Sequence, residues 1–364
     1  MAAFRPLWRG FIAKLRLFLL SAVLIGLLLP CANAMQAGFV GRMGPLSNSQ
    51  RATLNLQLVG ASSLPSFVSF TRASGRTCID GSGVMRVIGN DVPCFDYNPA
   101  TLAPRGLLIE GARTNILLNS NILSTQTVTT AAVSYTLSFY GTGSVTLSGT
   151  FTGSLTGSGA YPARSTLTFT PSAGSLTLTV TGNVQFANLE AGPFASSYIP
   201  TTSIAATRAA DIAVITNVAA IGYNQNDGGI VLSATLAGTD TAMNQRFVHI
   251  DDGTNNNRMT ITKGSGPANL VESVVVGGAA SSIGSFMAPT VGQELRIGLT
   301  YDAVGIAGSV NGSSVLSGGT SSPKGITALR IGSSIAGEYL FGWVAYLQYY
   351  SYRLPNSTLQ QLTQ

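Results

Sequence analysis

Charged side chains are rare in this sequence, and three of them stand together in one apolar stretch. Only 9% of the 364 residues are charged, yet RGLLIEGARTNILLN (105–119) holds Arg105, Glu110 and Arg113 within nine positions. Acid–base catalysis has little use for this set, because Glu110 has neither a partner carboxylate nor a histidine nearby in the sequence. An arginine pairs readily with a carboxylate through two parallel hydrogen bonds. The stretch therefore predicts an internal clamp, in which Glu110 pairs with Arg113, with Arg105 or with the distant Arg72.

Support for an enzyme is thin elsewhere in the chain. His249 is the only histidine, and no G-x-S-x-G sequence accompanies it, so a catalytic triad is not indicated. Glycan hydrolysis needs two carboxylates across a sugar bond. The five glutamates stand isolated instead: Glu110, Glu190, Glu272, Glu294 and Glu338. We therefore expect no enzyme, with carboxylates that converge from distant positions as the alternative.

The stretch HIDDGTNNN (249–257) is the best candidate for a cation site. Asp251, Asp252 and Asn255 offer hard oxygen ligands at short spacing, which suits calcium. The same residues are typical of a polar hairpin turn, where Asp, Asn and Gly fit the backbone geometry. The sequence thus favours a turn and leaves calcium as the alternative; no other cofactor is expected.

An aromatic stretch near the C-terminus is a candidate sugar-binding surface. The side chains of Trp343, Tyr346 and Tyr350 are able to stack on sugar rings. Strict alternation along a strand places Tyr346 and Tyr350 on one face and Trp343 on the other. One face of a sandwich strand belongs to the core, so burial of the two tyrosines would exclude stacking on their face.

The first 34 residues resemble an export signal. A basic region ends at Arg16, an apolar run of 13 residues follows (17–29), and Ala32-Asn33-Ala34 completes the pattern of a signal peptide. The run is shorter than the ~20 residues that cross a bilayer, so we expect no stable membrane anchor. Met35 comes next, and the alternative is that it is the true start.

The same segment carries much of the net charge. It contains four of the 20 basic residues and no acid, so 16 basic residues face 14 acidic ones in the remainder. A basic footprint for nucleic acid is therefore not expected.

Cleavage of residues 1–34 would also leave two cysteines, Cys78 and Cys94. They predict a disulfide in an oxidising compartment or, alternatively, two unpaired core thiols.

Two tracts of alternating residues predict an all-β fold of antiparallel sandwiches. The range 121–207 is rich in Thr, Ser and Gly and alternates with period two, as in a small jelly-roll-like sandwich. The range 208–364 holds about nine candidate strands, a hairpin signal at Asn311-Gly312 and a short C-terminal helix. Ahead of them lie a polar arm (35–65) and a segment (66–120) with a hairpin across the DGSG turn.

Several stretches together resemble a module of tailed-phage and prophage structural proteins of the tail-fibre or head-fibre type. They are FTRAS (70–74), DGSGV (80–84), NDVPCFDYNP (90–99), RGLLIEGARTNILLNS (105–120) and LEAGPFASSYIPTTSIAATRAADIAVI (189–215). The C-terminal stretches LTYDAVGIAGSVNG, ALRIGSS and GWVAYLQYYSYRLPNSTLQQLT resemble a concanavalin A-like (laminin-G-like) sandwich found in the same proteins. The resemblance runs from about Ser66 to the C-terminus.

The resemblance implies a virion surface component that binds a host surface glycan or other virion proteins, as a homo-oligomer, and it implies no catalytic residues. The family pattern usually has an aromatic residue near Cys78 and an arginine at the position of Cys94, and this paired replacement favours a bridge between the two cysteines. Phage virion proteins normally lack a signal-like N-terminus. Residues 1–34 therefore support the alternative of an exported bacterial lectin or adhesin, periplasmic or extracellular.

Overall fold

The computed structural model describes residues 51–266 and 269–364, and the compact part of the chain is Ala52–Gln364. The predicted export signal (1–34) lies outside the described residues. None of the helices that are described is long and apolar enough to cross a membrane. The described chain is almost entirely β-structure in antiparallel sheets, which confirms the predicted fold class.

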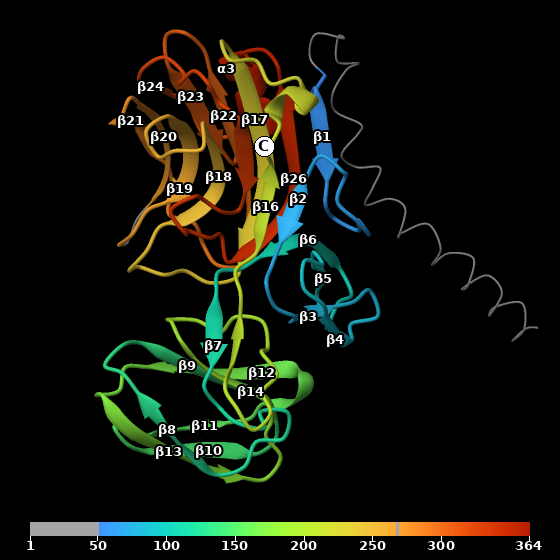
Figure 1. The fold of residues 1–364 in the computed structure, drawn as a ribbon, viewed down its shortest axis with the longest axis vertical. Coiled ribbons are helices and arrows are strands. Elements are labelled where there is room, and N and C mark those ends of the chain that lie inside the picture. Colours follow the sequence, from blue (N-terminus) through green and yellow to red (C-terminus); the bar gives the residue numbers. More distant parts are fainter. Residues whose placement is uncertain (1–50, 267–268) are drawn as a thin grey trace, which may run out of the picture. The chain divides into compact units, whose positions relative to one another are not determined.

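Two large sheets form the C-terminal sandwich (Figure 1). The first sheet runs in the order β24 (Leu316–Gly318), β23 (Ile306–Val310), β22 (Glu294–Tyr301), β17 (Gly228–Leu236), β26 (Gly342–Tyr350), β6 (Pro104–Ile109) and β5 (Phe95–Tyr97), and β1 (Leu54–Gln57) also pairs with β26. The second runs β2 (Ser69–Thr71), β16 (Ile212–Ile215), β25 (Ala328–Ile331), β18 (Gln245–Asp251), β19 (Arg258–Lys263), β20 (Leu270–Val276) and β21 (Ala279–Ser285). Alternating Ile, Leu and Val side chains of both sheets share one core.

This core also takes in residues from the N-terminal half of the chain. The sequence predicts a featureless arm over 35–65, but the described part of that range contains β1, whose Leu54 and Leu56 are buried with Leu58. The reason is the alternation in LNLQL, which turns every leucine to one face. The range 66–120 is divided between the two sheets, since β2 pairs with β16 and β6 pairs with β26.

A smaller sandwich, drawn in green in Figure 1, has its own core. One sheet runs β11 (Gly153–Thr156), β10 (Ser144–Gly149), β13 (Gly174–Thr181) and β8 (Gln126–Thr130), and the other runs β12 (Gly159–Phe169), β9 (Tyr135–Gly141) and β14 (Gln185–Ala191). In β10 the side chains of Val145 and Leu147 are buried, whereas Thr146 between them is exposed. The Thr/Ser/Gly-rich composition is therefore that of a thin sandwich with wet outer faces.

Short elements connect and close these sandwiches. The chain enters and leaves the smaller sandwich through a two-stranded ladder, β7 (Arg113–Asn115) and β15 (Ala206–Arg208). The hairpin of β3 (Arg76–Ile79) and β4 (Met85–Ile88) turns at DGSG, as predicted. Asn311 and Gly312 have φ of 49° and 71°, which fits the predicted type I′ turn. The remaining elements are the 3-10 turn η2 (Val218–Ile221) and the helix α3 (Asn356–Leu362).

Candidate functional site

Glu110 lies at the centre of a buried ion network where the two sandwiches meet. Its Oε2 lies 2.6 Å from a guanidinium nitrogen of Arg76 and 2.6 Å from one of Arg208. Its Oε1 accepts a hydrogen bond from the backbone N–H of Ser197 at 2.9 Å. Burial would raise the pKa of Glu110, but the charges of Arg208 and Arg76 and the hydrogen bonds from Ser197 lower it to about 2. Glu110 is therefore held as a carboxylate and is unsuited to donate a proton as a general acid.

Asp211 is the second acid of the network. Its carboxylate lies 3.2 Å from Arg72 and 2.6 Å from Arg76, and it also accepts the backbone N–H of Glu110 at 2.8 Å. The side chains of Arg72, Arg76, Arg208 and Asp211 are fully buried. Three arginines and two carboxylates are thus joined in one desolvated cluster.

The predicted partners of Glu110 were wrong, although the predicted internal clamp exists. Arg72 belongs to the cluster but pairs with Asp211. Arg113 lies on the short strand β7, where its guanidinium packs over the rings of Phe194 and Phe341 and donates to the carbonyl of Ala191. Arg105 lies in β6, where a β-bulge interrupts the alternation, and its guanidinium packs over the ring of Trp343.

The arginines that pair with Glu110, Arg76 and Arg208, lie in segments far from it in the sequence. Arg76 opens β3 and Arg208 ends β15, 34 and 98 positions away from Glu110. One signal was available, because TRAS (71–74) and TRAA (207–210) share their Thr-Arg-Ala sequence and both arginines join the cluster.

A cavity of about 360 Å³ opens beside this network. Its lining comes from the β3–β6 region, from the smaller sandwich and from β26, and it includes Glu110, Asp96, Arg105, Arg164, Tyr140 and Trp343. A cavity of this size with a few converging polar groups is the usual form of a small-molecule site. It is therefore the best candidate binding site within the described residues.

Two carboxylates line the cavity, Glu110 and Asp96, and Asp96 is not part of the buried ion network. Its Oδ1 accepts the backbone N–H of Ile79 at 2.9 Å, and its Oδ2 accepts the indole N–H of Trp343 at 2.9 Å. Burial raises the pKa of Asp96, while these hydrogen bonds and the charges of Arg76 and Arg105 oppose the rise. The nearest nitrogen of Arg105 is 4.0 Å from Oδ2, which is too far for a hydrogen bond.

Trp343 holds Arg105 as well as Asp96. The guanidinium carbon of Arg105 lies 4.4 Å from the centroid of the Trp343 ring, so the cation covers one face of the indole. Trp343 thus lines the candidate site, and ligand binding by this residue stays a prediction. There its ring packs against Arg105 and its indole N–H donates to Asp96, so it positions these two charged side chains.

The predicted stacking surface of Tyr346 and Tyr350 is not present. Tyr350 is 2% exposed and Tyr346 is partly buried, both packed in the small apolar cluster around Leu354 and Leu359. A β-bulge also breaks the expected alternation, since Ser233 pairs with Tyr346 and Ala234 with Val344. The extra residue between them shifts the side-chain parity along β26.

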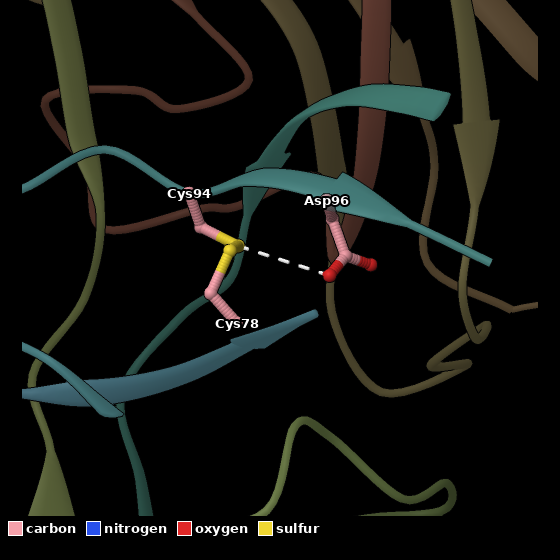
Figure 2. Close-up of side chains that lie close together, drawn as sticks. All are labelled: Cys78, Cys94 and Asp96. Atoms are coloured by element: carbon pink, nitrogen blue, oxygen red, sulfur yellow. Dashed lines mark hydrogen bonds between the residues drawn. A yellow bond between two sulfur atoms is a disulfide. The ribbon is translucent and has the colours of Figure 1, made fainter. Parts of the chain in front are cut away.

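Cys78 and Cys94 form a disulfide with a sulfur–sulfur distance of 2.02 Å (Figure 2). Cys78 lines the cavity, and the Cys94 sulfur lies 3.8 Å from Oδ1 of Asp96. These three residues are the one His/Cys/Asp/Glu group among the described residues with metal-binding proximity. Metal ligation by cysteine needs a thiolate, which a bridged sulfur does not provide, so the group is a structural support of the cavity wall.

The candidate calcium ligands are engaged within a turn. The buried Asp251 carboxylate accepts from Arg330 at 2.8 Å and from the N–H of Gly253 at 2.8 Å. Asp252 accepts from the N–H and hydroxyl of Thr254 at 2.8 and 2.7 Å. Asn255 is exposed at the tip of the loop. This geometry is that of the polar turn, and calcium binding there stays a prediction.

His249 is 1% exposed in the middle of β18 and faces Arg330 across the ladder. Burial and the charges of Arg246, Arg258 and Arg330 lower the pKa of His249 to about 3. The imidazole is therefore neutral at physiological pH. Its Nε2 is 3.7 Å from Asp251, beyond hydrogen-bond range.

The described chain is thus an all-β protein of two sandwiches, joined by a buried ion network and hollowed by a cavity beside it. No protein-family model matches the chain, and no curated protein matches it. Among solved structures it is similar to domain 4 of AbnA, an extracellular arabinanase from Geobacillus stearothermophilus, in complex with arabinotriose (14% identity, 43% of this chain and 73% of that chain, TM-score 0.37).

Two further structures are similar over comparable lengths. One is the CBM40 of the Ruminococcus gnavus IT-sialidase (16% identity, 40% of this chain and 87% of that chain, TM-score 0.33). The other is a SAP-like pentraxin from Limulus polyphemus (13% identity, 39% of this chain and 73% of that chain, TM-score 0.29). Similarities at this level do not indicate what this chain binds, and the resemblance to phage structural modules depends on its sequence stretches alone.

Proposed function

We propose that this chain is a structural protein of a phage or prophage virion, a fibre or appendage subunit that attaches the particle to a saccharide of the host surface. One observation carries the proposal. The stretches that resemble phage structural modules supply four of the five charged residues of the buried network, namely Arg72 from 70–74, Glu110 from 105–120, and Arg208 and Asp211 from 189–215. These four residues and Arg76 are engaged with one another, which suits a scaffold better than a reaction centre.

The network also supports the idea of a rigid attachment subunit. Breaking a buried ion pair leaves an uncompensated charge, at a cost of about 3–5 kcal/mol. The backbone N–H and the hydroxyl of Ser197, which follows β14 of the smaller sandwich, bind the same Glu110 carboxylate at 2.9 and 2.7 Å. The two sandwiches are therefore tied by groups that resist separation, and the cavity lies at this joint.

Saccharide binding is assigned to the cavity because of its lining. Sugars present many hydroxyl groups and are recognised by convergent charged and amide side chains beside aromatic walls. Asp96, Arg105 and Asn98 supply such groups, and Tyr140 supplies an aromatic wall. Assembly of several copies belongs to the same proposal, and light scattering of the purified full chain measures it.

The second candidate function is that of an exported bacterial lectin or adhesin. The Cys78–Cys94 disulfide favours it, because disulfides persist in oxidising compartments and are rare in the cytosol where virions assemble. The signal-like residues 1–34 point the same way.

Two measurements separate the candidates. Mass spectrometry of purified virions detects the chain if it is a virion component, and its absence from virions would overturn the first proposal. A Met35→Leu change in the gene abolishes production if Met35 is the true start. If residues 1–34 are a signal, production continues and a shortened chain reaches the periplasm or medium.

A further inference from the structure

We propose that the cavity binds the carboxylate of an acidic sugar, and that Arg105 is the residue that anchors it. This inference rests on the proposed function, since it takes saccharide binding at the cavity as given.

Arg105 is a fixed cation whose hydrogen-bond donors are free. Its guanidinium rests on the Trp343 ring at 4.4 Å, and its side chain is 33% exposed. Stacking uses the face of the guanidinium and leaves its five N–H donors in the plane. Within the described residues, Arg105 donates no hydrogen bond, and the nearest carboxylate oxygen, of Asp96, is 4.0 Å away.

Asp96 does not accept a hydrogen bond from Arg105, because the nearest guanidinium nitrogen is 4.0 Å from its Oδ2 and the carboxylate is fixed by other donors. Ile79 donates to Oδ1 and Trp343 donates to Oδ2, each at 2.9 Å. Trp343 therefore fixes both members of an arginine–aspartate pair and keeps them apart. The result is an oriented fork of donors at the cavity, which matches the planar geometry of a carboxylate.

A second arginine on the lining, Arg164, has an N–H donor without a partner among the described residues. Arg164 donates to the carbonyl of Ser196 and to the hydroxyl of Ser138, both at 2.7 Å. Its Nε is buried and has no partner among the described residues. A buried N–H without an acceptor is destabilising, so a ligand oxygen or a water molecule is expected there.

The charge balance of the lining favours a singly charged anion. Glu110 is already paired within the buried network, and the other charged side chains on the lining are Asp96, Arg105 and Arg164, one acid against two bases. A sugar carboxylate carries one negative charge and matches this excess. Asn98 adds a neutral donor, because its Oδ1 accepts from the backbone N–H groups of Ala100 and Thr101 and its amide nitrogen is left for a sugar hydroxyl.

The test uses the purified full chain and paired probes. Oligogalacturonate and α2,3-sialyllactose represent two sources of a sugar carboxylate, and the carboxyl-reduced form of each is its neutral counterpart. Binding is followed by surface plasmon resonance and by the fluorescence of Trp343, which is the one tryptophan besides Trp8. We expect at least one acidic probe to bind and to change the fluorescence, with its reduced counterpart at least about tenfold weaker.

The variant Arg105→Gln keeps a polar side chain and removes the charge. We expect it to weaken binding of the acidic probe by about 10- to 100-fold, the range for a charge-assisted hydrogen-bonded contact. Arg86→Gln is the matched control, because Arg86 is an arginine of the neighbouring hairpin whose side chain is 62% exposed. Equal melting temperatures of the variants exclude a folding defect.

The outcomes are distinct. Equal binding of an acidic probe and its reduced form, or unchanged binding by Arg105→Gln, would overturn the acidic-sugar inference and leave saccharide attachment standing. If neither these probes nor a panel of neutral host-surface oligosaccharides binds, the inference and the saccharide part of the proposed function fail together.

Discussion

Arg208 places a guanidinium nitrogen 2.6 Å from Oε2 of Glu110, although 98 positions separate the two residues in the sequence. Between them the chain builds the whole of the smaller sandwich. The ion pair therefore closes this sandwich at its base, where the chain leaves and returns to the larger one.

Replacement of Glu110 by Gln should destabilise the protein strongly. Arg76 and Arg208 would lose their shared carboxylate while staying buried, so we expect the free energy of unfolding to fall by about 3–5 kcal/mol. Urea unfolding followed by circular dichroism measures it. Glu294→Gln is the control, because Glu294 is 52% exposed and surface ion pairs contribute about 1 kcal/mol or less. An unchanged midpoint in Glu110→Gln would refute the clamp.

The same carboxylate should make the protein sensitive to acid. The pKa of Glu110 falls from an ordinary 4.5 to about 2 in the folded state. Below pH 4.5 the unfolded chain takes up a proton that the folded chain does not, so this contribution is complete above pH 4.5 and is lost toward pH 2. We expect the difference in stability between wild type and Glu110→Gln to shrink over this range. A difference that is constant from pH 6 to pH 2.5 would contradict the lowered pKa.

Glu272 should destabilise the core, and its effect on the free energy of unfolding should grow as pH rises, opposite to the effect of Glu110. It is fully buried on β20, neither oxygen has a partner among the described residues, and a Cβ at Gly308 would overlap its carboxylate. Burial raises the pKa of Glu272, so above pH 4.5 the unfolded chain releases a proton that the folded chain keeps. Stability is thus lost as pH rises.

We therefore expect Glu272→Leu to raise the free energy of unfolding by about 1–3 kcal/mol at neutral pH, and by more at pH 8.5 than at pH 5.5. Guanidinium unfolding at the two pH values measures the change. The exposed Glu294→Gln serves again as the comparison. A Glu272→Leu protein that is less stable than wild type at every pH would show that the carboxyl has a partner in the core.

Reduction of the Cys78–Cys94 disulfide should weaken the wall of the cavity. The bridge closes a loop across 16 positions, for which the chain-entropy model gives about 3 kcal/mol. Unfolding with and without a reductant measures the loss, and a Cys78→Ala/Cys94→Ala double variant should show no effect of the reductant. Equal stability of the wild type in both conditions would mean that the bridge does not constrain the unfolded chain.

Local pattern predicted much of the fold and little of the site. Alternation located most strands of both sandwiches but not the short β8, β11 and β16, and Asn311-Gly312 marked its hairpin, because these features depend on neighbouring residues. β21 was missed, since its sequence AASSIGS has small side chains and little contrast between faces. The role of β1 was missed because its alternation is only four residues long.

The site depends on contacts between distant segments, which spacing does not reveal. The sequence pointed to Glu110 as a clamp and to Trp343 as a ligand-site residue, yet Arg76 and Arg208 reach Glu110 only once the sandwiches are assembled. Asp96 joins Trp343 across 247 positions. Tyr346 and Tyr350 pack in the apolar cluster around Leu354 and Leu359, a contact with a later segment that alternation along β26 does not reveal.

The most direct test of the account is competition for host adsorption. Purified wild-type chain, added to host cells before the phage whose virions contain it, should slow adsorption, because it occupies the same surface saccharide. Arg86→Gln should compete equally well, and Arg105→Gln should not compete at the same concentration. If the wild-type chain leaves the adsorption rate unchanged at concentrations that saturate the cell surface, the proposed attachment function is contradicted.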